Sequence, residues 1–315
     1  MKRPLRVLTW HVHGNYLYAL TQVPHEWYLV TDAQRSPQHA GRSGTLPWGD
    51  NVHEVPIERV ADTPFDVVLF QSRSAWDDEQ HRVLNAAQRR GPRIYLEHDP
   101  PQQHPTNTRH WVDDRGVLLV HVTPFNALMW DSGEVPVRVI EHGVRLLQPV
   151  RWHGEIASGL VVVNNIDRRG RRLGADVFAE VARHVPLTLV GMGSERCGGI
   201  GEVSHHELPA RMAAHRFFFN PIRYTSLGLA VVEAMMVGAP VVALATTELA
   251  SVIRSGDNGI TDTRIDRLVE AMHGLLDDPR QAQAIGEAGR RSARERFGIE
   301  RFVADWDAAL REVTR

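Results

Sequence analysis

The sequence predicts an α/β protein with parallel sheets, and three observations lead to this prediction. Residues 217–245 have the pattern of a strand, a loop, a helix and a second strand, and such a crossover between parallel strands is normally right-handed. Short apolar runs alternate with helical segments elsewhere in the chain. With 315 residues, of which 43% are hydrophobic, the chain is long enough for two domains.

Composition and charge argue against several classes of protein. The formal net charge of −2 provides no basic field for nucleic acid. The single cysteine, Cys197, excludes an intramolecular disulfide and suits a reducing cytoplasm. The basic N-terminus lacks the apolar core of a signal peptide, and the apolar stretch 227–245 contains Glu233 and Pro240, which favours a buried core over a membrane span. The 17 histidines form no convincing ligand set, so we predict no metal.

The first half of the chain is predicted to contain strands at 6–10, 26–30, 65–70, 93–96 and 116–122. A loop with Gly14 follows the first strand, at the edge where open α/β sheets bind ligands; a tight strand-to-helix turn is the alternative. Residues 33–49 form a long turn-rich segment, which is usually either functional or disordered. Residues 77–90 predict one helix, because they begin with Asp and Glu and end with Arg-Arg-Gly.

Three ionisable residues follow the strand at 93–96. Glu97, His98 and Asp99 stand just before a double proline, which holds them rigidly at the carboxyl edge of the sheet. A core or capping role is the commoner outcome for such a histidine. An imidazole in this position could also hydrogen-bond a ligand, with Glu97 and Asp99 as candidates for holding its tautomer.

The second half begins with a strand at 159–163 and an arginine cluster. Arg168, Arg169, Arg171 and Arg172 fall within five residues, ahead of a predicted helix. Guanidinium groups bind phosphate oxygens bidentately, whereas a solvated surface is the alternative. The spacing does not decide which arginines would bind. The turn at 191–193 lacks the third glycine of a dinucleotide fingerprint, which argues against an NAD-dependent oxidoreductase.

The segment 217–245 contains the predicted phosphate site. Its helix starts near 226–229, where unpaired N–H groups and the helix dipole attract anions, and Gly228 permits close approach of a ligand. Gly238 fits the end of the helix. Glu233, amid apolar neighbours, needs a partner such as a pair of ribose hydroxyls; the alternative is a solvated Glu on an exposed helix face.

The stretch SLGLAVVEAMMVGAPVVA resembles the donor-site signature of retaining glycosyltransferases of family 4, which adopt the GT-B fold. That signature has an acidic residue, seven further residues, a Glu followed by Ala, and then Gly-x-Pro-Val-Val. The matching positions are Glu233, Ala234, Gly238, Pro240, Val241 and Val242. Thr225 stands where the family has the acidic residue that contacts the donor sugar, so the departure bears on donor identity and on activity.

The resemblance implies two facing Rossmann-like domains with the active site in the interdomain cleft. Residues 1–148 would form the acceptor-side domain and 149–298 the donor domain, with a helix at 299–315 packing back toward the first domain. The implied function is a hexosyltransferase-type glycosyltransferase that moves a sugar from a nucleotide-diphosphate donor to an unidentified acceptor, with retention and without metal or cofactor. A non-catalytic nucleotide-sugar-binding or scaffold protein of the same fold is the alternative, and Thr225 is its best support.

The resemblance also assigns site residues. His98 and Glu233 would act in the active site. The donor would be bound by Arg168, Arg169, Arg172, Gly193, Thr225, Ser226, Leu227, Gly228, Leu229 and Glu233. An acceptor or phosphate loop would comprise Gly14, Asn15, Tyr16 and Arg109. The expected partners are a nucleotide sugar and a carbohydrate, lipid-linked or small-molecule acceptor, without nucleic acid, in a cytoplasmic protein whose peripheral membrane contact is left open.

Overall fold

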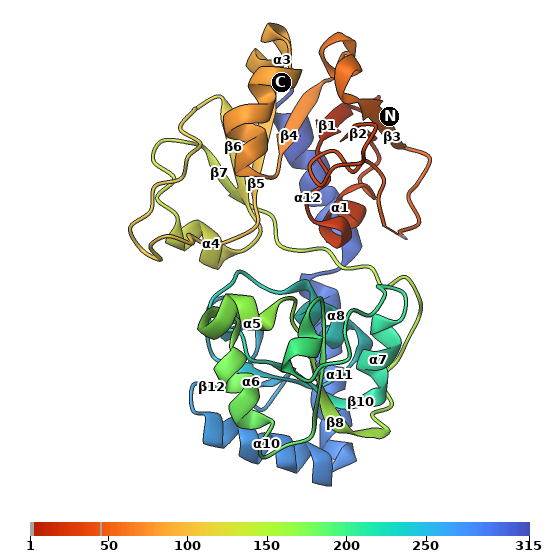
Figure 1. The fold of residues 1–315 in the computed structure, drawn as a ribbon, viewed down its shortest axis with the longest axis vertical. Helices are drawn as coiled ribbons and strands as arrows, with labels where there is room; N and C mark the ends of the chain where they lie inside the picture. Colours follow the sequence, from red (N-terminus) through yellow and green to blue (C-terminus); the bar gives the residue numbers. More distant parts are fainter. Residues whose placement is uncertain (1–2, 45) are drawn as a thin grey trace. The chain divides into compact units, whose positions relative to one another are not determined.

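The chain forms two compact units in a computed structural model that describes residues 3–44 and 46–315. Unit 1 comprises Met1–Gly143 and Ile299–Arg315, and unit 2 comprises Val144–Gly298 (Figure 1). The sequence prediction places the boundary after residue 148, five residues later. Val144 belongs to unit 2 because its N–H donates to Phe297 O at 2.9 Å and its side chain packs into the core of that unit.

Unit 1 is built on a parallel sheet that has seven strands in the described residues. Their order is β3-β2-β1-β4-β5-β6-β7. The strands are β1 Arg6–Thr9, β2 Glu26–Thr31, β3 Val52–Pro56, β4 Val67–Phe70, β5 Arg93–Glu97, β6 Val117–His121 and β7 Val137–Val139. The chain moves outward from β1 to one edge and then resumes at β4 on the other side of β1. This reversal of strand order opens a crevice at the carboxyl ends of β1 and β4.

The helices of unit 1 are short, except for the last one. They are α1 Gly14–Leu20, η1 Ile57–Asp62, the π-helix η2 Ala75–Glu79, α2 Gln80–Val83, α3 Ala86–Arg90, α4 Pro124–Met129 and α12 Ile299–Glu312. The prediction of one helix over 77–90 is wrong, because the chain is extended at Leu84. The Asn85 side chain then accepts from the N–H groups of Ala87 and Gln88 in a capping box and starts a new helix.

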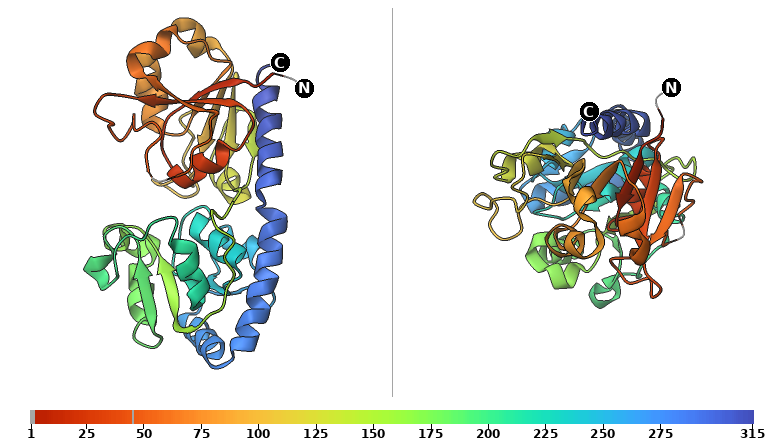
Figure 2. Two further views of the ribbon diagram at one scale, coloured as in Figure 1. Left: turned by 90° about the vertical axis from the view of Figure 1, so that its right-hand side faces the viewer. Right: turned by 90° about the horizontal axis from the view of Figure 1, so that it is seen from above.

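Helix α12 closes unit 1 with two aromatic side chains. Phe302 and Trp306 are fully buried, and they lie four residues apart on one helical face. Trp306 Nε1 donates to the hydroxyl of Tyr16 at 3.3 Å, and the Phe302 ring packs edge-on against the same tyrosine. Figure 2 shows α12 lying alongside unit 1.

Unit 2 is a five-stranded parallel sheet, as far as its described residues go, in the order β12-β11-β10-β8-β9. The strands are β8 Ile156–Val162, β9 Leu187–Val190, β10 His215–Asn220, β11 Val241–Leu244 and β12 Ile260–Asp262. The helices are α5 Ile166–Arg169, η3 Gly170–Leu173, α6 Ala175–Val181, η4 Ser194–Cys197, α7 Leu208–Ala214, α8 Leu229–Val237, α9 Leu249–Val252, α10 Ile265–Asp277 and α11 Pro279–Arg296.

Strand β10 shows why this sheet is covered on both faces. Successive side chains of a strand point to opposite faces. Phe218 accordingly packs with α7, α8 and α11 in one core, whereas Phe217 and Phe219 pack with α6 and α10 in the other. A strand buried on both faces reads as a continuous apolar run, which is the pattern that predicted it.

Candidate functional site

The strands β8 and β10 form the point in the unit 2 sheet where the strand order reverses. β9 lies outside β8, and β11 lies outside β10, so the chain leaves the two central strands toward opposite sides. In open parallel sheets, ligands bind in the crevice at this point. The segments that follow these strands are the arginine-rich residues 164–174 and the loop 221–228, which also carry the strongest sequence signals.

Backbone contacts hold the arginine-rich segment against the end of β10. The N–H groups of Arg223 and Tyr224 donate to Arg172 O at 3.0 and 3.3 Å. Gly174 has a φ of +78°, and a Cβ there would lie 2.0 Å from Pro221 O. Glycine alone permits this approach, which brings the arginines beside the loop that leads into α8.

Three of the four arginines in this cluster have no ion-pair partner among the residues that the structure describes. These are Arg168, Arg169 and Arg172. Arg171 differs, because it contacts Asp176 at 2.6 Å, and Asp176 also pairs with Arg223. An unpaired guanidinium is available for phosphate oxygens. The geometry thus separates Arg171 from the other three, whose role in donor binding stays a prediction.

Hydrogen bonds from the end of β11 hold the loop before α8. Thr246 Oγ1 donates to Ile222 O at 3.1 Å, and Thr247 Oγ1 donates to Ser226 O at 3.4 Å. Gly228 is the N-cap residue, with extended backbone and no side-chain cap. The first N–H groups of a helix have no intrahelical acceptor and carry partial positive charge. Among the predicted donor residues here, Thr225, Gly228 and Leu229 are half-buried, and Ser226 and Leu227 are buried.

Glu233 lies on the second turn of α8 and is 6% exposed. The alternative of a solvated side chain on an exposed helix face is therefore wrong, because α8 packs into the core of unit 2. Burial raises the pKa of Glu233 to about 7. Its Oε1 lies 3.9 Å from His205 Nδ1, beyond hydrogen-bond distance. A buried carboxyl group in this setting gains from hydrogen-bond donors such as ribose hydroxyls.

Gly193 belongs to a turn at the carboxyl end of β9, next to the end of β8. It has a φ of +70°, which glycine adopts readily. The turn is tied to the segment after β8, since Met192 N–H donates to Asn164 Oδ1 at 2.9 Å and Asn165 N–H donates to Met192 O at 2.7 Å. The structure therefore brings Gly193 to the same sheet edge as the arginines.

In unit 1, His98 follows β5, and its imidazole is held by Gln71, which follows β4. His98 Nε2 lies 3.1 Å from Gln71 Oε1. Gln71 Nε2 donates to Thr9 Oγ1 at 3.0 Å and to Trp10 O at 3.1 Å, so the amide oxygen faces His98 and accepts from Nε2–H. Burial and neighbouring histidines lower the pKa of His98 well below its usual value. The ring is neutral at pH 7, and its Nδ1 is an acceptor.

Glu97 does not hold this tautomer, and neither does Asp99, so that prediction is wrong. Glu97 Oε1 accepts the backbone N–H of Asp99 at 2.9 Å, and Oε2 lies 3.1 Å from His110 Nε2. Val112 N–H donates to His110 Nδ1 at 3.1 Å, so His110 carries its hydrogen on Nε2 and donates it to Glu97. Burial raises the pKa of Glu97 to about 8 and lowers that of His110 to about 4.

A cavity of about 570 Å³ opens beside His98 at the carboxyl edge of β4 and β5. This volume lies within the range of about 300–1,000 Å³ that small-molecule sites occupy. Three aromatic side chains line it: Tyr95, Trp111 and Trp130. Arg109 also lines it, and pairs with Asp113 at 2.9 Å. The sequence indicated Trp111 as a residue available to an acceptor, but Tyr95, Trp130 and Gln71 were missed. The position of Gln71 directly after a buried strand was an available signal.

The predicted loop after β1 divides into two parts. Gly14 and Asn15 begin α1 and are half-buried. Tyr16 is 2% exposed, and its hydroxyl receives the Trp306 hydrogen bond, while burial raises its pKa. The structure therefore places Tyr16 in the core of unit 1, beside α12, and not where a phosphate or acceptor can reach it.

Within residues 3–44 and 46–315, no three His, Cys, Asp or Glu side chains are grouped so that they could hold a metal ion. None of the helices in that part of the chain has both the length and the apolar content that a bilayer span requires.

The sequence of this chain is similar to those of known glycosyltransferases. Residues 192–292 match the family model described as glycosyl transferases group 1. The chain is 34% identical over 178 residues to the MMP alpha-(1->4)-mannosyltransferase of Mycolicibacterium hassiacum, a match that covers 55% of this chain and 39% of that protein. It is 30% identical over 152 residues to a GDP-mannose-dependent alpha-(1-6)-phosphatidylinositol monomannoside mannosyltransferase of Mycolicibacterium smegmatis, covering 40% of each. The chain thus spans about two fifths of each of these relatives.

Solved structures match the whole chain. Sucrose-phosphate synthase from Thermosynechococcus elongatus superposes with a TM-score of 0.67 at 18% identity, covering 99% of both chains. Anabaena Alr3699/HepE, solved with UDP and glucose, superposes with a TM-score of 0.69 at 12% identity, covering 98% of this chain and 100% of the other. At these identities the likeness shows the fold.

The chain therefore has the GT-B fold, with two Rossmann-like α/β units. Residues 192–292 of its second unit are similar to the group 1 glycosyltransferases.

Proposed function

We propose that this protein transfers a sugar from a nucleoside-diphosphate sugar to an acceptor, with retention of the anomeric configuration and without a metal. The observation that supports this best lies in unit 2. A buried Glu233 shares one sheet edge with the N-terminus of α8 and with three arginines that have no ion-pair partner among the described residues. Carboxylate, guanidinium forks and backbone amides are the groups that a ribose and a diphosphate require.

Each group has a role in this proposal. Glu233 accepts hydrogen bonds from the ribose hydroxyls. The arginines and the amides near Gly228 stabilise the charge that develops on the departing diphosphate, which is an electrostatic contribution that needs no metal. His98, neutral and with Nδ1 as an acceptor, holds a hydroxyl of the reacting sugar. Retention is inferred from the resemblance to family 4 alone. It is not inferred from a nucleophilic residue of this chain.

The relatives indicate which donor to test first. Two of them are named as mannosyltransferases, one of them dependent on GDP-mannose, and a structural neighbour was solved with UDP and glucose. We therefore propose a guanosine or uridine diphosphate sugar, with GDP-mannose as the first candidate.

The test is a thermal-shift screen of the purified chain with UDP, GDP, ADP and TDP and their sugars, in EDTA and with added Mg²⁺. A ligand at about one hundred times its Kd adds roughly 2.7 kcal/mol of stability, which raises Tm measurably. We expect one base to shift Tm equally with and without Mg²⁺, and Glu233→Ala to abolish the shift. Absence of a shift with every nucleotide would contradict the proposed donor site.

Turnover separates the enzyme from a protein that only binds nucleotide sugars, the alternative that Thr225 supports. We expect slow hydrolysis of the shifted donor to nucleoside diphosphate. His98→Ala should lower this rate by about 10- to 100-fold, the size of a lost transition-state interaction, and should change nucleotide affinity by less than about twofold. Donor binding without any turnover would favour the non-catalytic alternative. The anomeric configuration of a product, read by NMR, tests retention.

A further inference from the structure

The chain that follows β2 closes on itself into a compact turn, which we call the β2 loop (residues 32–41). An isolated antiparallel β-bridge closes its base, and the N–H of Asp32 donates to His39 O at 3.3 Å. The N–H and the hydroxyl of Ser36 donate to the two carboxylate oxygens of Asp32 at 3.0 and 2.6 Å. Because these contacts lie within the loop, it can attach to its neighbours or detach from them as one piece.

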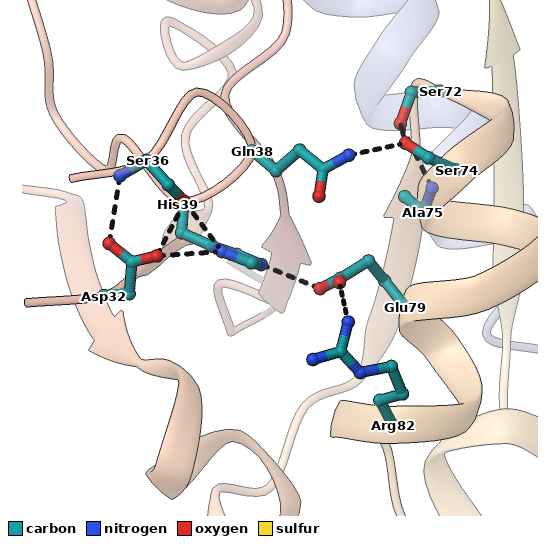
Figure 3. Close-up of polar contacts among 9 residues, drawn as sticks. All are labelled: Asp32, Ser36, Gln38, His39, Ser72, Ser74, Ala75, Glu79 and Arg82. Atoms are coloured by element: carbon teal, nitrogen blue, oxygen red, sulfur yellow. Dashed lines mark hydrogen bonds and ion pairs between the residues drawn. The ribbon is translucent and has the colours of Figure 1, made fainter. Parts of the chain in front are cut away.

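Two side chains of the β2 loop reach across to the π-helix η2 and its N-cap residue (Figure 3). His39 Nε2 lies 2.7 Å from Glu79 Oε2, and Gln38 Nε2 donates to Ser74 Oγ at 3.3 Å. His39 and Glu79 are 7% and 3% exposed, so water competes little for the contact between them. This contact is therefore the main attachment of the loop to η2.

The geometry around His39 requires a hydrogen on both ring nitrogens. Its Nδ1 lies 3.2 Å from Asp32 Oδ2 and 3.2 Å from Ser36 Oγ. The Ser36 hydroxyl uses its one hydrogen on Asp32, so toward Nδ1 it can only accept. Nε2 faces an oxygen of the Glu79 carboxylate and donates there. A neutral imidazole has a single N–H, so the His39 ring joins the two carboxylates as an imidazolium.

The charges of this bridge balance. The other oxygen of Glu79 lies 3.2 Å from Arg82 Nη1 of α2. Hydrogen bonds from Ser36 lower the pKa of Asp32 to about 2, which keeps Asp32 ionised. Two carboxylates, one imidazolium and one guanidinium cancel in charge, and loss of the proton from His39 would leave one negative charge in excess.

Two further charged or titratable side chains border the β2 loop from other elements or bind its neighbours. His11, in the loop after β1, lies 2.7 Å from Gly41 O through Nδ1. Arg35, within the β2 loop, donates to Glu54 of β3 at 2.9 Å. These contacts hold the side of the loop that faces away from η2, so the bridge through His39 is the link that a change of charge affects.

The β2 loop forms one wall of a cavity of about 180 Å³ in unit 1. Pro37 and Gln38 line the cavity from the loop, whereas Ser72, Ser74 and Glu79 line it from the opposite side. The cavity lies at the carboxyl ends of β1 and β4, where the strand order reverses and where open sheets form their ligand crevice. Detachment of the loop from η2 would widen access to this crevice.

We propose that the β2 loop is a lid over this crevice, and that the protonation state of His39 decides whether the lid is attached to η2. The imidazolium donates to both carboxylates and holds the lid closed. When the ring loses a proton, one N–H remains for two carboxylates, and their mutual repulsion favours detachment. The lid is thus closed at low pH and is released as pH rises. This regulation does not depend on the donor site, because every group involved belongs to unit 1.

Hydrogen–deuterium exchange of the full chain, read by mass spectrometry, measures attachment of the lid. Exchange is recorded from about pH 5.5 to 8.5, which spans the charge change of histidine side chains. Rates are compared with those of an unstructured peptide at the same pH, which removes the pH dependence of the exchange chemistry. We expect protection of residues 32–41 to fall about tenfold or more over this range, the effect of losing a charge-assisted hydrogen bond.

Two substitutions give opposite results under this proposal. His39→Gln removes the charge and keeps one donor group, so the lid should be poorly protected at every pH, with a change of less than about twofold across the range. In Glu79→Gln the new amide can donate to Nε2 of a neutral ring. The lid should then stay protected at high pH as well as at low pH. Tm is measured for each variant to establish that the chain is folded.

His53→Gln is the matched control. His53 also contacts a carboxylate of unit 1, with Nε2 at 2.6 Å from Glu26 Oε2, but it lies on β3 and outside the β2 loop. This change should leave the protection of the lid and its pH dependence unaltered. Equal effects of His39→Gln and His53→Gln would overturn the proposal.

NMR of the imidazole nitrogens in the wild-type chain tests the charge of His39 directly. We expect both nitrogens to be protonated at the low end of the pH range and one of them to lose its hydrogen as the lid is released. A neutral ring throughout the range, or lid protection in the wild type that does not change with pH, would overturn the proposal. The same follows if His39→Gln retains the pH dependence of the wild type, since another group such as His11 would then cause it.

Discussion

The two sheets of this protein place different chemistry at equivalent positions. Each is an open parallel sheet whose strand order reverses at two central strands, β1 and β4 in unit 1 and β8 and β10 in unit 2. In unit 2 the carboxyl ends of these strands lead to the N-terminus of α8 and to arginines that form no ion pair within residues 3–44 and 46–315. In unit 1 they lead to Gln71 and to the carboxylate of Glu79. The neutral imidazole of His98 follows the next strand, β5, and contacts Gln71.

In open α/β folds the strand order determines where ligands bind, and the loops determine which ligands bind. Cationic forks and amides suit phosphate. Carboxylates, imidazole and aromatic rings suit hydroxyls and sugar faces. Under the proposed function, these two kinds of site suit a donor and an acceptor respectively. Substitutions of single residues can test this comparison.

The largest effect is expected from Gly174→Ala in unit 2. The methyl group would require left-handed backbone at φ +78° and would overlap Pro221 O at 2.0 Å. We expect a loss of at least about 3 kcal/mol of stability, measured by denaturant titration, together with loss of nucleotide binding. Gly198→Ala is the control: its backbone is left-handed at φ +76° and ψ 14°, but no atom lies within 4 Å of the added Cβ, so the cost should be about 1–2 kcal/mol. If the two substitutions reduce stability equally, the close approach of Gly174 to Pro221 O is contradicted.

The next prediction concerns the pH dependence of unit 1. The pKa of Glu97 is raised from 4.5 to about 8, so its stabilisation is complete below pH 4.5 and is lost as pH rises toward 8. The buried His98, His110 and His121 have lowered pKa values, so they change the free energy of unfolding only below about pH 6.5. Between pH 6.5 and 8 we therefore expect Glu97 to reduce the free energy of unfolding by about 2 kcal/mol.

Urea titrations at pH 6.5 and 8 measure this change. Glu97→Gln has no group that titrates, so its stability should differ between the two pH values by much less than that of the wild type. Glu233, whose pKa is raised to about 7, also reduces the free energy of unfolding over this pH range, but by less. This contribution is present in both proteins, so it cancels when their pH dependences are compared. An unchanged pH slope in Glu97→Gln would show that Glu97 is ionised throughout this range.

The smallest effects are expected within the arginine cluster. Alanine at Arg168, Arg169 or Arg172 should each weaken nucleoside-diphosphate binding about five- to tenfold at low salt, by loss of a charge-assisted hydrogen bond. Arg171→Ala should change it by less than about twofold, because Arg171 already pairs with Asp176. Isothermal titration with the nucleotide found in the thermal-shift screen compares the four. If Arg171→Ala weakens nucleotide binding as much as the other three substitutions do, then ion pairing does not decide which arginines bind the nucleotide.

Local signals made the centre of unit 2 predictable from sequence. The run Phe217–Phe219, the helix stop at Gly238 and the apolar surroundings of Glu233 are properties of neighbours in the chain. They correctly indicated β10, α8 and β11, with bounds that shift by one or two residues. The fold class followed, because parallel strands joined through helices allow few other arrangements.

Signals that depend on distant partners were missed or misread. The predicted helix at 77–90 is interrupted because Asn85 caps a new helix. Tyr16 looked like a loop residue, and α12, nearly 300 positions later, buries it. The tautomer of His98 is set by Gln71 and not by its chain neighbours.

The sequence by itself determined which strands are buried on both faces, the α/β class, the position of the motif around Glu233 and the arginine cluster at 168–172. Periodicity, helix stops and charge spacing depend on residues that are close together in the chain, so they can be identified from a single sequence. The tertiary structure alone decided which arginines are unpaired, that Glu233 is buried, and that His39 joins Asp32 to a Glu79 that stands 40 residues away. Such pairings depend on strand order, because sheet topology brings the ends of non-consecutive strands to one edge.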